Sequence, residues 1–322
     1  MIMKTLISIC VLSFTFLVFN FNACRPQHTP KDNKDQTYTI QFQGYERDYI
    51  VHVPPEAQMQ KPAPLLFHLH GGGGTAKGTA GLTFNRFNDL ADRDGFIVVY
   101  PNAIKKNWND GRKLEEVKAW KENIDDVGFI REIVSNLQDK YNIDSSRIFT
   151  TGMSNGGFMS SRLLCDASDI FRGGAILTAS LSKDYIPKCD PVKPVAVMVM
   201  NGTDDPLVPY DGGQVRVFKK NRGEIVSTDD YMTFWKGKNG CTVEKNTIEL
   251  PNTSDDGTTV SVEEYEACQD GGALVLYKIN GGGHTWPGGK QYLGKRWIGK
   301  TNRDIVACDV IWDFFKNLPE AD

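Results

Sequence analysis

The chain has 322 residues, of which 40% are hydrophobic, and it carries a formal net charge of -3. Such a length suits one large α/β domain, and this share of hydrophobic residues can build its core. The small negative charge provides no broad basic field, so nucleic acid is excluded as an expected partner.

The amino terminus predicts export. Residues 1–23 consist mainly of an apolar run that is short for a membrane span and typical of a secretory signal. The run ends at Ala23-Cys24, which resembles a bacterial lipobox, although Phe21 and Asn22 depart from its usual residues. We expect a signal peptide over 1–23 and a lipid anchor on Cys24, which would be the protein's only contact with a membrane. Cleavage with free release is the alternative.

A single domain is predicted to follow a tether. Residues 24–36 are polar and contain two prolines, as a tether does, and residues 37–322 are predicted to form the domain. Two alternating runs, 38–42 and 49–53, predict an antiparallel hairpin at its start. The sequence shows no internal repeat and no second domain.

Buried-type strands then alternate with helical stretches. This alternation predicts an α/β fold with a doubly wound, mostly parallel sheet behind the antiparallel hairpin. The predicted strands are 65–70, 96–100, 147–151, 174–178, 195–200 and 274–279, and the predicted helices include 127–141 and 304–317.

Four glycines, 71–74, follow the first of these strands. Amides without a side chain can approach a tetrahedral oxyanion closely, so we expect the N–H of Gly72 to be one oxyanion donor. A dinucleotide-binding loop also fits these glycines, but the strand 96–100 ends without the acidic residue that would bind a ribose. We expect His68 and His70 to brace the loop rather than to catalyse.

A long polar segment, 101–126, contains Trp108 and Trp120. It is either a lid over a binding site or a solvated excursion held by two aromatic anchors, and the residues do not separate these possibilities. Trp108 is a candidate for contact with substrate if the segment is a lid.

The most informative segment is 147–159, where a β-branched strand leads into G-M-S-N-G at 152–156 and then into a stretch that can form a helix. Glycines flank the serine because its strained turn would crowd a Cβ at either position. This context predicts that Ser154 is a nucleophile and that the N–H of Asn155, at the helix start, is a second oxyanion donor.

A serine hydroxyl needs a base, and the base needs an acid that orients it. In hydrolases with such a turn the chain order is serine, acid, histidine, and only His284 of the five histidines follows Ser154. The acid should follow the buried strand 195–200, where Asp204 and Asp205 compete. We favour Asp205 and expect the other aspartate to cap the turn or face water.

Trp286 lies two residues after His284, in a glycine-rich loop that must border the site. An indole there can stack on a flat acyl group or a sugar ring, so we expect Trp286 to contact substrate. The alternative is that it packs inward and fixes the histidine loop. No grouping of cysteine and histidine has zinc-site spacing, so we expect neither a metal nor another cofactor.

Export makes disulfides possible. Five cysteines remain beyond the amino terminus, so at least one is free if all pairs are internal. We expect Cys241–Cys268 to clamp an excursion of low hydrophobicity before the histidine strand. We expect Cys165–Cys189 to tie the helix after the serine to the next loop, and Cys308 to be a buried thiol.

Five motifs, in their order along the chain, resemble the secreted poly(3-hydroxybutyrate) depolymerase and feruloyl esterase group, in carbohydrate esterase family one of the α/β-hydrolase superfamily. They are LHGGGG at 69–74, IDDVGFI at 124–130, GMSNGG at 152–157, NGTDDPLVPYDGG at 201–213 and GGGHTWPGG at 281–289.

The resemblance implies a serine esterase whose triad is Ser154, Asp205 and His284, because the family's aspartate falls on Asp205. The family often has a cysteine where this chain has Gly72, so a disulfide sometimes made there is excluded. Asp125 and Asp126 match the family's acidic pair. We expect them to be the N-cap and the first-turn acid of the helix that follows.

The expected activity is that of an exported, cofactor-free, monomeric carboxylic ester hydrolase that acts through an acyl-enzyme. Feruloyl or acetyl esters on plant polysaccharide are the expected substrates, and a hydroxyalkanoate polyester is the alternative. A peptidase of this fold usually carries a gating domain for which the length leaves no room. A non-catalytic binding protein of this fold would typically have lost a triad residue.

Overall fold

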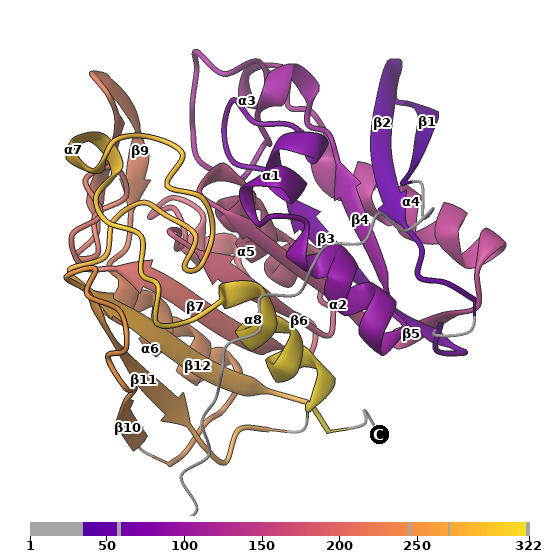
Figure 1. Ribbon diagram of the computed structural model, residues 1–322. Coiled ribbons are helices and arrows are strands. Elements are labelled where there is room, and N and C mark those ends of the chain that lie inside the picture. The colour runs from indigo at the N-terminus through magenta and orange to yellow at the C-terminus, as the bar shows by residue number, and fades with distance from the viewer. Residues whose placement is uncertain (1–34, 57–58, 244–245, 270, 320–322) are drawn as a thin grey trace, which may run out of the picture. The chain divides into compact units, whose positions relative to one another are not determined.

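The computed structural model describes residues 35–56, 59–243, 246–269 and 271–319 (Figure 1). The predicted signal peptide and Cys24 lie outside these residues. The strands in the described part of the chain are β1 (Gln36–Phe42), β2 (Tyr45–His52), β3 (Ala63–Leu69), β4 (Ile97–Pro101), β5 (Ile143–Met153), β6 (Gly173–Leu177), β7 (Ala196–Gly202), β8 (Gly213–Val217), β9 (Lys220–Ile225), β10 (Asn246–Glu249), β11 (Thr259–Tyr265) and β12 (Ala273–Asn280).

Ten of these strands form one sheet in the order β1-β2-β4-β3-β5-β6-β7-β12-β11-β10, and β8 pairs with β9 separately. The six strands from β4 to β12 run parallel, whereas β1, β2, β10 and β11 are antiparallel to their neighbours. The carboxyl ends of β5, β7 and β12 therefore lie at one edge of the sheet, where loops carry the ligand-facing residues of α/β proteins.

Helices cover both faces of this sheet (Figure 1). No helix in the described segments is both long and apolar enough to cross a membrane. The helices there are α1 (Ala76–Leu82), α2 (Arg86–Asp94), α3 (Lys118–Lys121), α4 (Asp126–Lys140), α5 (Asn155–Asp166), α6 (Thr228–Lys238), α7 (Lys295–Ile298) and α8 (Ala307–Lys316).

Strand residues alternate between two apolar cores, one on each face of the sheet. In β3, Leu65 and Phe67 belong to the core that contains α4, α5 and α6, whereas Leu66 belongs to the core that contains α1, α2 and α8. Because both faces are covered, the central strands are nearly continuous apolar runs, such as IVVYP in β4 and AVMVM in β7.

This sheet confirms the predicted doubly wound, mostly parallel architecture and its antiparallel hairpin at the amino terminus. The predicted parallel strands and the helices α4 and α8 are present, with ends shifted by a few residues. One expectation is wrong, because the segment between Cys241 and Cys268 is not a mere excursion. It forms β10 and β11, and Val260 and Val262 bury their side chains against the core beneath them.

Two disulfides join the pairs of cysteines expected from the sequence, Cys165–Cys189 and Cys241–Cys268. The paired cysteines are 24 positions apart in the sequence in the first disulfide and 27 positions apart in the second. Disulfides of this kind persist in oxidising compartments. Cys308, in α8, is a buried free thiol.

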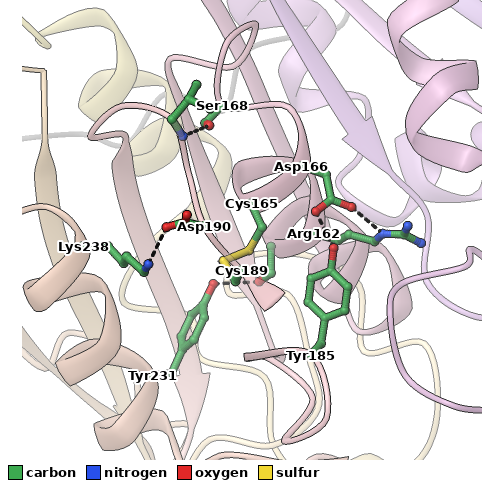
Figure 2. The surroundings of a disulfide bond; sticks show 11 residues. Arg162, Cys165, Asp166, Ser168, Tyr185, Cys189, Asp190, Tyr231 and Lys238 are labelled. Atoms are coloured by element: carbon green, nitrogen blue, oxygen red, sulfur yellow. Dashed lines mark hydrogen bonds and ion pairs between the residues drawn. A yellow bond between two sulfur atoms is a disulfide. The ribbon is translucent and has the colours of Figure 1, made fainter. Parts of the chain in front are cut away.

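The Cys165–Cys189 disulfide fixes the end of α5 (Figure 2). Beside it, Asp166 accepts a hydrogen bond from the hydroxyl of Tyr185 and pairs with Arg162 at 3.0 Å. Arg162 also donates to the backbone carbonyl of Asn109 at 2.6 Å. The helix that begins after Ser154 is thus held at its far end and along its side.

Candidate active site

Ser154 occupies a sharp turn between β5 and α5. Its φ of 58° and ψ of -124° are strained for a residue with a Cβ. Its N–H donates to the carbonyl of Leu177 at 2.9 Å and to Oγ1 of Thr178 at 3.1 Å, which anchors the turn to the end of β6. A Cβ on Gly152 or Gly156 would collide with backbone carbonyl groups, so both glycines of the motif are required by close packing.

His284 follows β12, and its Nδ1 lies 2.7 Å from Oδ2 of Asp205, which follows β7. The other oxygen of Asp205 accepts hydrogen bonds from the N–H groups of Leu207 at 2.8 Å and Val208 at 2.9 Å. Both residues are buried: His284 is 3% exposed and Asp205 is 8% exposed. Asp204 is exposed, so of the two competing aspartates the structure brings Asp205 to the histidine.

Ser154 and His284 line the same pocket, which has a volume of about 580 Å³. Glycines 71–74 form one side of it. Much of the remaining wall is apolar, as is common where a flat or aliphatic group binds. The apolar side chains that line it include Leu114, Val117, Leu207, Val215, Val217 and Leu293.

The expected oxyanion donors lie beside the serine. A Cβ built on Gly71 would lie 3.7 Å from Cβ of Ser154, and one built on Gly72 would lie 3.6 Å from Cβ of Asn155. Within the described residues, no group accepts a hydrogen bond from the N–H of Gly72, whereas the next N–H, of Gly73, donates to Lys106. Asn155 begins α5, where an N–H has no acceptor within the helix.

The segment 101–126 is packed against the serine turn. The amide of Asn155 accepts from the N–H of Trp108 at 2.8 Å and donates to the carboxylate of Asp110 at 2.6 Å. Asp110 also pairs with Arg112 at 2.6 Å, and Arg112 lines the pocket. The segment is therefore a fixed wall of the pocket. Asp110 and Arg112 could not be predicted from the sequence, since no local pattern marks them.

Trp108 does not face the pocket. Its side chain is 1% exposed, its ring lies 5.0 Å from that of His70, and its Nε1 donates to the carbonyl of His70 at 2.9 Å. The expectation that it contacts substrate is corrected, because the indole anchors segment 101–126 to the glycine loop.

Trp286 also packs inward. It is 1% exposed, and its ring lies 4.8 Å from that of His68 and 6.1 Å from that of Phe87, in the core over α1, α2 and α8. Trp286 is not among the described residues that line the pocket. The expectation that Trp286 grips substrate is wrong, because its loop turns the indole into the core and only His284 toward the cavity.

His70 supports the glycine loop, as expected, whereas His68 bonds to Thr79 of α1. Nδ1 of His70 donates to the carbonyl of Gly71 at 2.8 Å, and its Nε2 accepts from the N–H of Ala103 at 3.1 Å. Burial lowers the pKa of His70 to about 4 and that of His68 to about 3. Both rings are therefore neutral at pH 7 and suited to bracing. In the described part of the chain, no three His, Cys, Asp or Glu side chains converge to hold a metal ion.

Known proteins resemble this chain in sequence and in fold. A family model described as esterase PHB depolymerase matches residues 47–184. Feruloyl esterase C of Emericella nidulans is 30% identical over 313 residues, which are 95% of this chain and 97% of that protein. Feruloyl esterase B of Piromyces equi is 30% identical over 251 residues, which are 76% of this chain and 44% of that protein.

Among solved structures, an acetyl xylan esterase from Aspergillus awamori superposes with a TM-score of 0.59. The superposition covers 87% of this chain and 99% of that one, at 14% sequence identity. At this identity the likeness shows a shared fold.

Proposed function

Because the chain belongs to the esterase group that contains the feruloyl esterases and the poly(3-hydroxybutyrate) depolymerases, we propose that Ser154, His284 and Asp205 are the catalytic residues of a carboxylic ester hydrolase. One observation carries the proposal. A serine with a φ of 58° shares a pocket with a histidine whose Nδ1 is bonded to a buried carboxylate. Strain at a pocket residue is a mark of a functional position.

In the first half of the reaction, Oγ of Ser154 attacks the carbonyl carbon of the ester while Nε2 of His284 takes the hydroxyl proton. Asp205 holds the imidazole in the tautomer that leaves Nε2 free to accept, and stabilises the imidazolium that forms. The N–H groups of Gly72 and Asn155 bind the oxyanion. Collapse of the tetrahedral species expels the alcohol, which takes the proton from His284, and leaves an acyl-serine.

In the second half, water attacks the acyl-serine. His284 removes a proton from the water and returns it to Oγ of Ser154 when the second tetrahedral species collapses. The carboxylic acid leaves, and the free serine is restored. No group besides the ester and water is consumed.

The proposed substrates are feruloyl or acetyl esters on plant polysaccharide. The names of the relatives support this class, because they are feruloyl esterases and an acetyl xylan esterase. The apolar wall of the pocket can accept the flat face of a hydroxycinnamoyl group. A poly(3-hydroxybutyrate) type of polyester is the second candidate, supported by the description of the family model.

A hydrolysis panel tests the substrate class. It contains methyl ferulate, acetylated xylan, short hydroxybutyrate oligomers and a p-nitrophenyl ester as the common reference. We expect kcat/KM on methyl ferulate or acetylated xylan to exceed that on the oligomers by at least about tenfold, a difference of about 1.4 kcal/mol in transition-state binding. The reverse order would favour the polyester, and inactivity on all four would contradict an esterase.

We further propose that the protein works outside the cytoplasm, held by a lipid on Cys24. The apolar amino terminus and the two disulfides support export. Feeding cells a clickable fatty-acid analogue should label the full chain, and Cys24→Ala should remove the label and the membrane association. Unlabelled wild-type protein in the medium would instead indicate plain cleavage and release.

A further inference from the structure

Basic residues are concentrated in two segments beside the pocket. The hairpin segment 214–222 contains four lysines and arginines, the loop 290–303 contains five, and neither contains an aspartate or a glutamate. The whole chain carries a net charge of -3, whereas these two segments are positively charged. Such a local field attracts an anionic ligand.

Two exposed aromatic side chains join these segments. Phe218, in the turn between β8 and β9, is 65% exposed, and Trp297, in α7, is 50% exposed. Their ring centroids lie 6.1 Å apart, and β9 and α7 are neighbours in Figure 1. Phe218 also lines the pocket that contains Ser154. The pair of rings therefore lies at the mouth of the proposed active site.

Two basic residues follow Phe218 in the sequence, and two precede Trp297. The three lysines among them form no ion pair within the described chain, and the guanidinium carbon of Arg296 lies 4.8 Å from the ring centroid of Trp297. Elsewhere on the surface, Lys183 and Lys238 do pair with carboxylates. We call the following six residues the basic aromatic rim: Phe218, Lys219, Lys220, Lys295, Arg296 and Trp297.

We propose that the basic aromatic rim binds the uronic-acid residues of an acidic polysaccharide, next to the ester held in the pocket. This inference rests on the proposed esterase function. An exposed indole or phenyl face stacks on the apolar face of a sugar ring, and lysine and arginine attract the carboxylates. A neutral polysaccharide would need only the rings, and a polyester has no charge along its chain. The combination of rings and cations therefore favours a uronate-bearing polymer.

The test uses the full chain and two charge-reversed double variants. The rim variant is Lys219→Glu with Lys220→Glu. The matched control is Lys188→Glu with Lys193→Glu, two exposed lysines that precede β7 and so lie at the edge of the sheet opposite the pocket. The substrates are acetylated homogalacturonan, acetylated neutral xylan and p-nitrophenyl acetate.

At low salt, we expect the rim variant to lose about tenfold in kcat/KM on acetylated homogalacturonan through KM, since each exposed charge contributes modestly. Its rates on neutral xylan and p-nitrophenyl acetate should stay within about twofold, and about 0.5 M NaCl should remove the difference. The control should match the wild type throughout. Trp297→Ala should raise KM on both polymers and spare p-nitrophenyl acetate.

Binding of de-esterified polygalacturonate, measured by titration calorimetry, separates the rim from the chemistry because no ester is cleaved. Loss of this binding in the rim variant, with the control unchanged, supports the rim. Binding to phosphatidylglycerol vesicles is measured in parallel. An unchanged affinity of the rim variant for polygalacturonate overturns the proposal. A variant that loses affinity only for the vesicles also overturns it, because the basic residues would then serve a lipid surface. Inactivity of the wild type on every ester would overturn the esterase function instead.

Discussion

Asp205 is bonded through both of its carboxylate oxygens. One contacts Nδ1 of His284, and the other accepts two backbone N–H groups of the turn that follows. Asparagine at position 205 would keep the shape of the side chain. Its amide would, however, place an N–H donor near the imidazole or favour the imidazole tautomer in which Nε2 cannot accept the serine proton. Asp204 is exposed, and among the described residues its carboxylate accepts a hydrogen bond only from the hydroxyl of Thr203.

We therefore expect Asp205→Asn to lower kcat by about ten-thousand-fold, and Asp204→Asn to change it by less than about threefold. The two variants carry the same chemical change at adjacent positions, so each controls for the other. Steady-state rates on a p-nitrophenyl ester decide between them. Equal losses, or a greater loss in Asp204→Asn, would remove Asp205 from the proposed triad.

The sequence predicted which residue types meet at the site, but not where large side chains point. Ser154, His284 and Asp205 follow from a motif, a chain order and a strand end. Trp286 follows the same chain logic and yet lies in the core, because the backbone bends at His284 and Thr285 and such a bend cannot be deduced from the spacing of the residues. Arg112 lines the pocket and pairs with Asp110, which in turn accepts a hydrogen bond from Asn155, a residue far away in the sequence.

The segment 101–126 is held against the sheet by the start of α4. Asp125 caps that helix by accepting from the N–H of Gly128 at 2.7 Å, as expected from the sequence. Asp126 lies in the first turn of the helix, as expected, but it also makes buried contacts that were not predicted. It is fully buried, pairs with Arg47 of β2 at 2.7 Å, and accepts from the N–H of Asn109 at 2.7 Å.

These two adjacent aspartates should differ sharply when they are changed. Asp126→Ala leaves the buried Arg47 without its partner and should lower the free energy of unfolding by about 3–5 kcal/mol. Asp125→Ala removes only a cap and should cost about 1 kcal/mol. Urea unfolding followed by circular dichroism measures both. A similar cost for the two changes would mean that the buried pair does not hold the segment.

The strands β10 and β11 show why the far edge of the sheet could not be predicted. The parallel core strands bury both faces and stand out as apolar runs, whereas β11 buries only Val260, Ser261 and Val262 within a largely polar sequence. Every residue of β10 is exposed, and the strand has no apolar pattern. β11 is held by its pairing with β12, and both β10 and β11 lie within the loop closed by the Cys241–Cys268 disulfide, contacts that the composition of the segment does not reveal.

The molecule's response to acid depends on histidines that the fold keeps neutral. Burial lowers the pKa of His68 to about 3 and that of His70 to about 4, while an unfolded chain binds these protons near pH 6.5. The stability they provide is present above about pH 6.5 and is lost as the pH falls toward these values. His52 acts in the opposite direction. Burial lowers its pKa, but hydrogen bonds to Asp35 and Asp92 raise it above the ordinary value, so its contribution is lost as the pH rises.

The free energy of unfolding should therefore fall between about pH 7.5 and pH 5, by about 2 kcal/mol for each buried neutral histidine. His68→Phe keeps a ring among Phe87, Tyr100 and Trp286 and removes one titrating group. We expect its loss over this interval to be smaller than that of the wild type by about 2 kcal/mol. Parallel pH profiles of the two proteins in urea unfolding would contradict this assignment.

Acylation of Ser154 is the step from which the other proposed roles follow. Mixing the protein with a p-nitrophenyl ester of a slowly hydrolysed acyl group, quenching in acid and mapping the peptides by mass spectrometry locates the acyl group directly. We expect a single acyl group on Ser154, and we expect Ser154→Ala to carry none and to lose on the order of a million-fold in kcat. An acyl group on any other residue, or a Ser154→Ala protein that retains more than a few per cent of the rate, would contradict the proposed mechanism.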